Sequence, residues 1–223
     1  DKPIPKGLKG TELAAFLYQR SLAASKIGRL KQRLKDIRKT VDIAEKRGGP
    51  LGRYLQELSF AEDNAGNLRN ALKIALRRAE VEEAVRGRLY HGTLGRIVQS
   101  YRLTGNLVEA KKWLERLKDR NDPAVQYCAG NSSPSCKNMA AATAIRYGST
   151  ALVLGAEGKF EEAIELRRNT QALIDKALDK DITTVLAKET YVDWANDSLQ
   201  KSASLKSQVG RLLEAEIDSR AGL

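Results

Sequence analysis

The sequence is poor in the residues on which most enzyme and metal sites depend. Its 223 residues include two cysteines and one histidine, His91, and aromatic residues make up only 5%. A tetrahedral zinc site needs about four ligands, so two thiols and one distant imidazole do not predict a metal. No nucleophile motif accompanies His91, and the glycine-rich stretch "GSTALVLGAEGK" lacks the spacing of a phosphate-binding loop. We therefore predict a non-catalytic protein without a metal or other cofactor.

Long apolar runs are also missing. No stretch of roughly 18 apolar residues occurs, so we expect no membrane span. The first residues, "DKPIPKGLKG", contain no apolar segment typical of a signal peptide, although a mature secreted chain would look the same. Only five prolines interrupt a chain rich in Ala, Leu, Lys, Arg and Glu, which are good helix formers.

The apolar residues follow a helical period. Over residues 30–44 they stand at intervals of 4, 3, 4 and 3, as a single stripe along one helix requires: Leu30, Leu34, Ile37, Val41 and Ala44. The same period continues along the chain, and alternation typical of strands is almost absent. We therefore expect an all-α protein.

A short motif recurs along this helical sequence. It consists of a glycine, an apolar residue two positions later and, in three of four copies, an alanine five positions later. The glycines are Gly28, Gly66, Gly105 and Gly158, separated by 38, 39 and 53 residues. Glycine permits the left-handed turn between two helices, and a small residue lets the helices cross closely. Because one helix pair cannot bury its own apolar face, we expect the pairs to stack.

These residues resemble the tetratricopeptide repeat (TPR), a helix–turn–helix module of about 34 residues. The best copy, "LGRIVQSYRLTGNLVEAKKWLERLKDRNDP", keeps Tyr101, Gly105, Leu107, Ala110 and Leu114. The first copy departs most, with Arg33 in place of the alanine. The resemblance implies a right-handed α-solenoid of stacked antiparallel helix pairs over residues 1–181, with copies at 11–47, 50–86, 88–123 and 138–180. Residues 182–223 keep helical spacing without an evident glycine break, and we expect capping helices there.

The longer third interval contains an insert at residues 121–137. "NDP" at Asn121–Pro123 predicts the end of the preceding helix, and a Gly, Asn, Ser and Pro-rich segment follows between Cys128 and Cys136. So short and polar a segment favours a disulfide between these cysteines, and hence a bacterial periplasm or the outside of a cell. Two free thiols in a cytoplasmic protein are the alternative.

In TPR proteins the first helix of each pair lines a groove that holds peptides or partner helices, so the resemblance implies another protein or peptide as partner. Some TPR proteins bind the C-terminal tails of chaperones through set positions of the groove. In this sequence the matching positions carry Tyr18, Leu22, Gln56 and Phe60, and only Arg96 resembles the residues used there. The arginines favour an acidic or amphipathic segment. The groove candidates are Tyr18, Leu22, Arg53, Gln56, Phe60, Asp63, Arg96, Gln99, Arg102, Ser149 and Leu152.

Three functions are compatible with the sequence. The first is a protein-binding scaffold, and the second is the N-terminal regulatory array of a larger bacterial protein such as a caspase-like (CHAT) peptidase. The third is an anionic-surface binder, because residues 1–53 hold 14 Lys and Arg against 5 Asp and Glu. Nucleic acid is not expected, since aromatic residues for base stacking are missing. The basic patch comprises Lys26, Arg29, Lys31, Lys35, Arg38 and Lys39.

Overall fold

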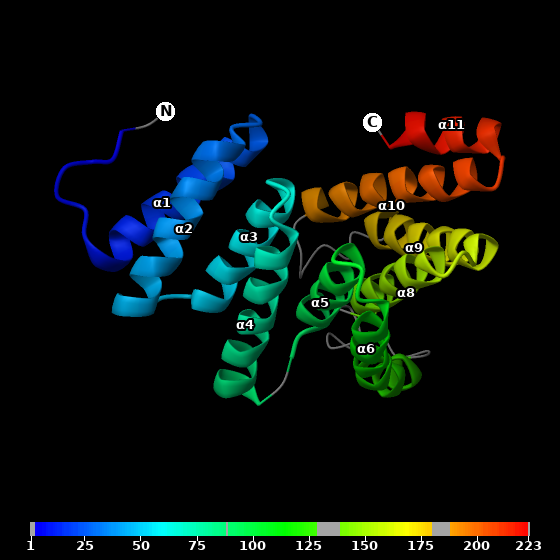
Figure 1. The fold of residues 1–223 in the computed structure, drawn as a ribbon, viewed down its shortest axis with the longest axis horizontal. Helices are drawn as coiled ribbons and strands as arrows, with labels where there is room; N and C mark the ends of the chain where they lie inside the picture. Colours follow the sequence, from blue (N-terminus) through cyan, green and yellow to red (C-terminus); the bar gives the residue numbers. More distant parts are fainter. Residues whose placement is uncertain (1–2, 88, 129–138, 180–187, 223) are drawn as a thin grey trace. The chain divides into compact units, whose positions relative to one another are not determined.

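The computed structural model describes residues 3–87, 89–128, 139–179 and 188–222, and every regular element among them is a helix (Figure 1). The prediction of an all-α fold is therefore confirmed. The chain divides into two compact units, residues 1–104 and 105–223, which are described separately.

In the described residues of the first unit there are five helices, and each one packs against the next along the chain from α1 to α5. The first two pairs run side by side in Figure 1, α1 with α2 and α3 with α4. Its core includes Tyr18, Ile37, Val41, Tyr54 and Leu55. The helices are α1 (Gly10–Lys26), α2 (Leu30–Arg47), α3 (Leu51–Asn64), α4 (Leu68–Arg86) and α5 (His91–Leu103).

The second unit repeats this arrangement. Its helix α8 packs against both α6 and α9, and α10 packs against both α9 and α11. The core around α9 and α10 includes Ala144, Ile174 and Ala195, with Trp194 packed at its side. The helices are α6 (Leu107–Cys128), α8 (Met139–Ala156), α9 (Phe160–Asp179), α10 (Lys188–Gln208) and α11 (Leu212–Ala221).

The predicted glycines occupy turns between consecutive helices and have a left-handed backbone, with φ of 70° to 80°. At Gly28, the N–H of the next residue, Arg29, donates to the carbonyl of Ala24 at 2.9 Å, which closes the helix end as in a Schellman turn. The same bond joins Lys159 to Leu154 at 2.9 Å after Gly158.

A fifth turn of this kind occurs at Gly210, between α10 and α11, with φ 78°. Arg211 N–H donates to the Lys206 carbonyl at 2.9 Å, as in the other turns. The motif continues with Leu212 and Ala215, so the expectation that residues 182–223 lack a glycine break is wrong. Leu212 and Ala215 stand two and five residues after Gly210, as the corresponding residues do in the other copies. The helices α10 and α11 therefore form a further pair of the repeat type.

Burial shows why small residues recur around each turn. The residues five after the five glycines are all buried, and so are those seven before them. In the second pair these two positions touch, because Ser59 Oγ donates to the Ala71 carbonyl at 3.0 Å. The buried residues are Ser21, Ser59, Val98, Ala151 and Ala203 before the turns, and Arg33, Ala71, Ala110, Ala163 and Ala215 after them.

One predicted boundary is wrong. Helix α6 does not end before Asn121 but continues through Pro123 to Cys128. A proline inside a helix removes one backbone hydrogen bond and costs about 3 kcal/mol, so the local turn signal at this position did not decide the helix end. Cys136 lies outside the described residues, so its bridge to Cys128 stays a prediction.

Candidate functional site

The groove candidates of the first unit gather around one side of α3. Arg53, Gln56, Phe60 and Asp63 follow one another at intervals of three or four residues, so they share a side of this helix. Helix α5 contributes Gln99 and Arg102 next to them. We call these six residues the α3–α5 face. It lies wholly within residues 1–104.

Tyr18 and Leu22 of α1 pack in the core next to this face. Tyr18 is only 6% exposed, with its ring centroid 5.0 Å from that of Tyr54. Burial, and next the charge of Glu57, raise the pKa of Tyr18 above its ordinary value, against a smaller opposing effect of Arg53. Leu22 packs against the same core. Both residues therefore act mainly in packing, and we leave them out of the candidate binding surface.

Arg53 stands at one end of the face. Its side chain is exposed, and its guanidinium carbon lies 5.6 Å from the centroid of the Tyr18 ring. Within the described part of the chain Arg53 makes no ion pair. It is therefore a cation held by an aromatic ring and still open to a partner.

Arg96 connects α5 to α3, and it is 6% exposed. Its guanidinium donates to Asp63 Oδ2 at 2.8 Å, to the Ser59 carbonyl at 2.9 Å and to Ser59 Oγ at 3.0 Å. The guanidinium carbon also lies 4.7 Å from the centroid of the Phe60 ring. With these donors occupied inside the protein, Arg96 holds two helices together and is poorly placed to bind a partner's carboxylate.

Arg102 stands at the other end of the face and is half-buried. Burial lowers its pKa, and the charge of Asp63 opposes that effect. The Nε of Arg102 is buried without a hydrogen-bond acceptor among the described residues.

Two further networks fix the helices that carry the face. Arg38 of α2 forms a bidentate ion pair with the buried Glu62 of α3, at 2.8 and 2.9 Å, and Asn67 donates to the same carboxylate at 2.7 Å. Glu82 of α4 accepts from Thr93 Oγ1 and from the N–H of Tyr90 at the start of α5. Sequence reasoning missed these pairs, since their partners stand at no fixed distance along the chain.

The other two groove candidates belong to the second unit. Ser149 and Leu152 lie on α8, where Ser149 is buried and Leu152 is half-buried. We therefore define the candidate surface by the residues of the first unit alone.

The residues of the predicted basic patch all have exposed side chains. Lys31, Lys35 and Lys39 stand four residues apart along α2, and Lys26 and Arg29 flank the turn at Gly28. Arg38 differs from them because its charge is paired with Glu62. The patch therefore rests mainly on the three lysines of α2.

Among the described residues no group of three or more His, Cys, Asp or Glu is placed to hold a metal ion. His91 is half-buried at the first position of α5. Within the same residues, no helix has the length and apolarity to span a membrane.

Comparison with known proteins supports the repeat architecture. No protein-family model and no curated protein sequence matches the chain. Among solved structures, the nearly identical TPR-like repeats of a Podosopora anserina protein described as a kinesin light chain align with a TM-score of 0.52. The identity is 14%, over 96% of this chain and 97% of that one. A variant of that protein gives a TM-score of 0.54 at 14% identity, over 96% of both chains. This chain therefore has the fold of the tetratricopeptide-type helical repeats.

Proposed function

We propose that this chain is a non-catalytic scaffold that binds an extended, acidic segment of another protein across the α3–α5 face. The observation that carries the proposal is the pair of cations at the two ends of this face. Arg53 is exposed and makes no ion pair among the described residues, and the half-buried Arg102 makes none there either. Gln56, Phe60 and Gln99, all half-buried, lie between them and offer polar and aromatic contacts.

The geometry sets the spacing that such a segment needs. Arg53 and Asp63 stand ten positions apart on α3, and Arg102 is near enough to Asp63 for that charge to act on its pKa. At about 1.5 Å per helical residue this is roughly 15 Å, which an extended chain at about 3.3 Å per residue covers in four to five residues. We therefore expect two acidic side chains four or five positions apart in the bound segment.

The test is a selection from displayed random peptides on the full chain, followed by affinity measurement with fluorescence polarisation. We expect enriched peptides to carry Asp or Glu at that spacing. Arg53→Gln and Arg102→Gln should each weaken binding by about tenfold, the equivalent of about 1.4 kcal/mol. The matched control is Lys35→Gln, an exposed cation on α2. Equal losses in all three variants, or enriched peptides without acidic residues, would contradict the proposal.

A second candidate function is binding to anionic lipid surfaces through α2. It rests on the exposed side chains of Lys31, Lys35 and Lys39, which make no ion pair within the part of the chain that the structure describes. Co-sedimentation with phosphatidylserine vesicles should fall steeply as salt rises and should be lost when all three lysines are changed to Gln. Binding that survives high salt would exclude this function.

A further inference from the structure

The turn between α1 and α2 exposes two large apolar side chains. Ile27 is 64% exposed and Leu30 is 43% exposed, on either side of Gly28. Exposed apolar side chains that lie together within a polar rim are typical of a surface that contacts another molecule. We call residues 26–31, all of which are exposed, the α1–α2 tip.

Backbone hydrogen bonds hold this tip in shape. The N–H of Arg29 donates to the Ala24 carbonyl at 2.9 Å, and the N–H of Leu30 donates to the Gly28 carbonyl at 2.9 Å. The tip joins the two helices at the end of the pair away from the connection to α3 (Figure 1). Its apolar side chains are therefore presented on a closed turn, which needs little ordering when it meets a partner.

The surface around the tip is positively charged. Lys26, Lys31 and Lys35 are exposed and make no ion pair within the described part of the chain. Residues 26–41 contain one carboxylate, that of Asp36. It is buried, and Arg20 donates to both of its oxygens at 2.7 Å. Asp36 is thus occupied inside the protein and leaves the charge of the exposed lysines in place.

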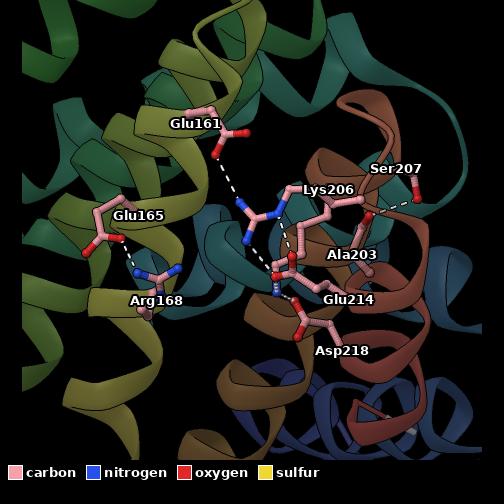
Figure 2. A network of polar contacts seen from close by, with 9 residues as sticks. Glu161, Glu165, Arg168, Ala203, Lys206, Ser207, Glu214 and Asp218 are labelled. Atoms are coloured by element: carbon pink, nitrogen blue, oxygen red, sulfur yellow. Dashed lines mark hydrogen bonds and ion pairs between the residues drawn. The ribbon is translucent and has the colours of Figure 1, made fainter.

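The turn between α10 and α11 provides a comparison within the same protein. It also exposes an apolar side chain, since Leu213 is 72% exposed. Its cations are paired, however. Lys206 Nζ lies 2.7 Å from Asp218 Oδ2, and Arg211 donates to Glu161 Oε2 at 2.9 Å (Figure 2). Of these two turns, the α1–α2 tip is the one that combines exposed apolar side chains with unpaired cations.

This combination fits the surface of an anionic bilayer. Apolar side chains can enter the boundary between headgroups and acyl chains, while the ammonium groups of lysines stay with the negatively charged headgroups. An acidic peptide would meet the lysines and leave the two apolar side chains in water. A bilayer accommodates both, so the charge and the apolar side chains together favour a membrane.

We propose that the α1–α2 tip inserts Ile27 and Leu30 into the interface of an anionic membrane, with Lys26, Lys31 and Lys35 on the surrounding headgroups. This inference rests on the lipid-binding function proposed above. It adds an apolar contribution to binding, which the lysines of α2 do not supply.

The test is co-sedimentation of the full chain with vesicles of phosphatidylserine and phosphatidylcholine at one low salt concentration. Ile27→Ser should weaken binding by about tenfold, because a large aliphatic side chain is no longer buried in the interface. Leu30→Ser should weaken it by about threefold, since the protein already covers more of that side chain. The control is Leu213→Ser, which removes an exposed apolar side chain and should leave binding unchanged. No loss in Ile27→Ser, or an equal loss in Leu213→Ser, would overturn the proposal.

The lysines separate this inference from the lipid-binding function itself. If changing Lys31, Lys35 and Lys39 to Gln abolishes sedimentation while Ile27→Ser has no effect, binding is electrostatic alone and the insertion is wrong. If the parent chain does not sediment with these vesicles, the lipid-binding function and the insertion are both wrong.

A tryptophan at the tip measures insertion directly. The fluorescence that Ile27→Trp adds should be quenched by lipids brominated on their acyl chains, and the fluorescence that Leu213→Trp adds should not. Trp113 and Trp194 give the same background in both variants. Thermal unfolding should be unchanged in both, because each replaced side chain is exposed. Added fluorescence in Ile27→Trp that brominated lipids leave unquenched would overturn the proposal.

Discussion

The clearest test of how the first unit is held together is Arg96→Ala. Arg96 is buried and donates three hydrogen bonds to α3, to Asp63 and to two oxygens of Ser59. Its removal leaves Asp63 without its cation and the Ser59 carbonyl without this donor. Arg96 therefore ties α5 to α3, although the sequence pattern placed it among ligand-binding residues.

The magnitude follows from these contacts. Breaking a buried ion pair by removing one partner costs about 3–5 kcal/mol. The Asp63 side chain is 17% exposed, so water relieves part of the penalty. We expect Arg96→Ala to lower the free energy of unfolding by about 3 kcal/mol, a large share of the roughly 5–15 kcal/mol typical of a domain.

Urea unfolding followed by far-ultraviolet circular dichroism measures this loss, and hydrogen exchange locates it. The amides of α3 and α5 should exchange faster in the variant than those of α9. Arg53→Ala is the control, because an exposed cation over a ring contributes only about 0.5–1 kcal/mol. A loss for Arg96→Ala no larger than that for Arg53→Ala would refute this account of the α3–α5 contact.

Three further predictions concern Glu62, the glycine turns and the cysteines. Burial alone would raise the pKa of Glu62, but hydrogen bonds from Arg38, Asn67 and Asn70 outweigh it and lower the pKa below its ordinary value of 4.5. The stability that comes from this depressed pKa is present above pH 4.5 and is lost as the pH falls through the folded-state pKa. The urea midpoint of Glu62→Gln should therefore depend less on pH in that range than the midpoint of the parent protein. Equal pH dependence of the two midpoints would contradict this. Gly210→Ala should lower the free energy of unfolding by about 1–2 kcal/mol because φ at this glycine is 78°. Gly52→Ala, inside α3, should raise it by about 0.5–1 kcal/mol. Thermal unfolding measures both changes, and the same sign for both would disprove the turn argument. Thiol titration of unreduced, denatured protein should find no free sulfhydryl if Cys128 and Cys136 are bridged, and two free thiols would rule out the disulfide.

Sequence reasoning succeeded where the physical cause is local. A glycine that must adopt positive φ, followed at a set distance by a small residue, marks a helix turn and the crossing beside it. Gly28, Gly66, Gly105 and Gly158 were found in this way. Gly210 carries the same signal with Leu212 and Ala215, and it could have been found by extending the alignment. The exposed lysines of α2 were also predictable, because the apolar stripe of one helix leaves the charged residues on its other sides.

The roles of individual polar side chains depended on packing between helices. Arg96 meets Ser59 across 37 positions of the chain, and Arg38 meets Glu62 across 24. No sequence period or motif connects such residues. The partner of each one depends on which helix packs against it and on which residue of that helix lies opposite. The same holds for Tyr18, which the repeat alignment assigned to a groove and which packing buried against Tyr54. The sequence thus determines the repeating turns locally. The partner of each charged side chain is decided only when the helices pack, because burial and ion pairing depend on neighbours in space.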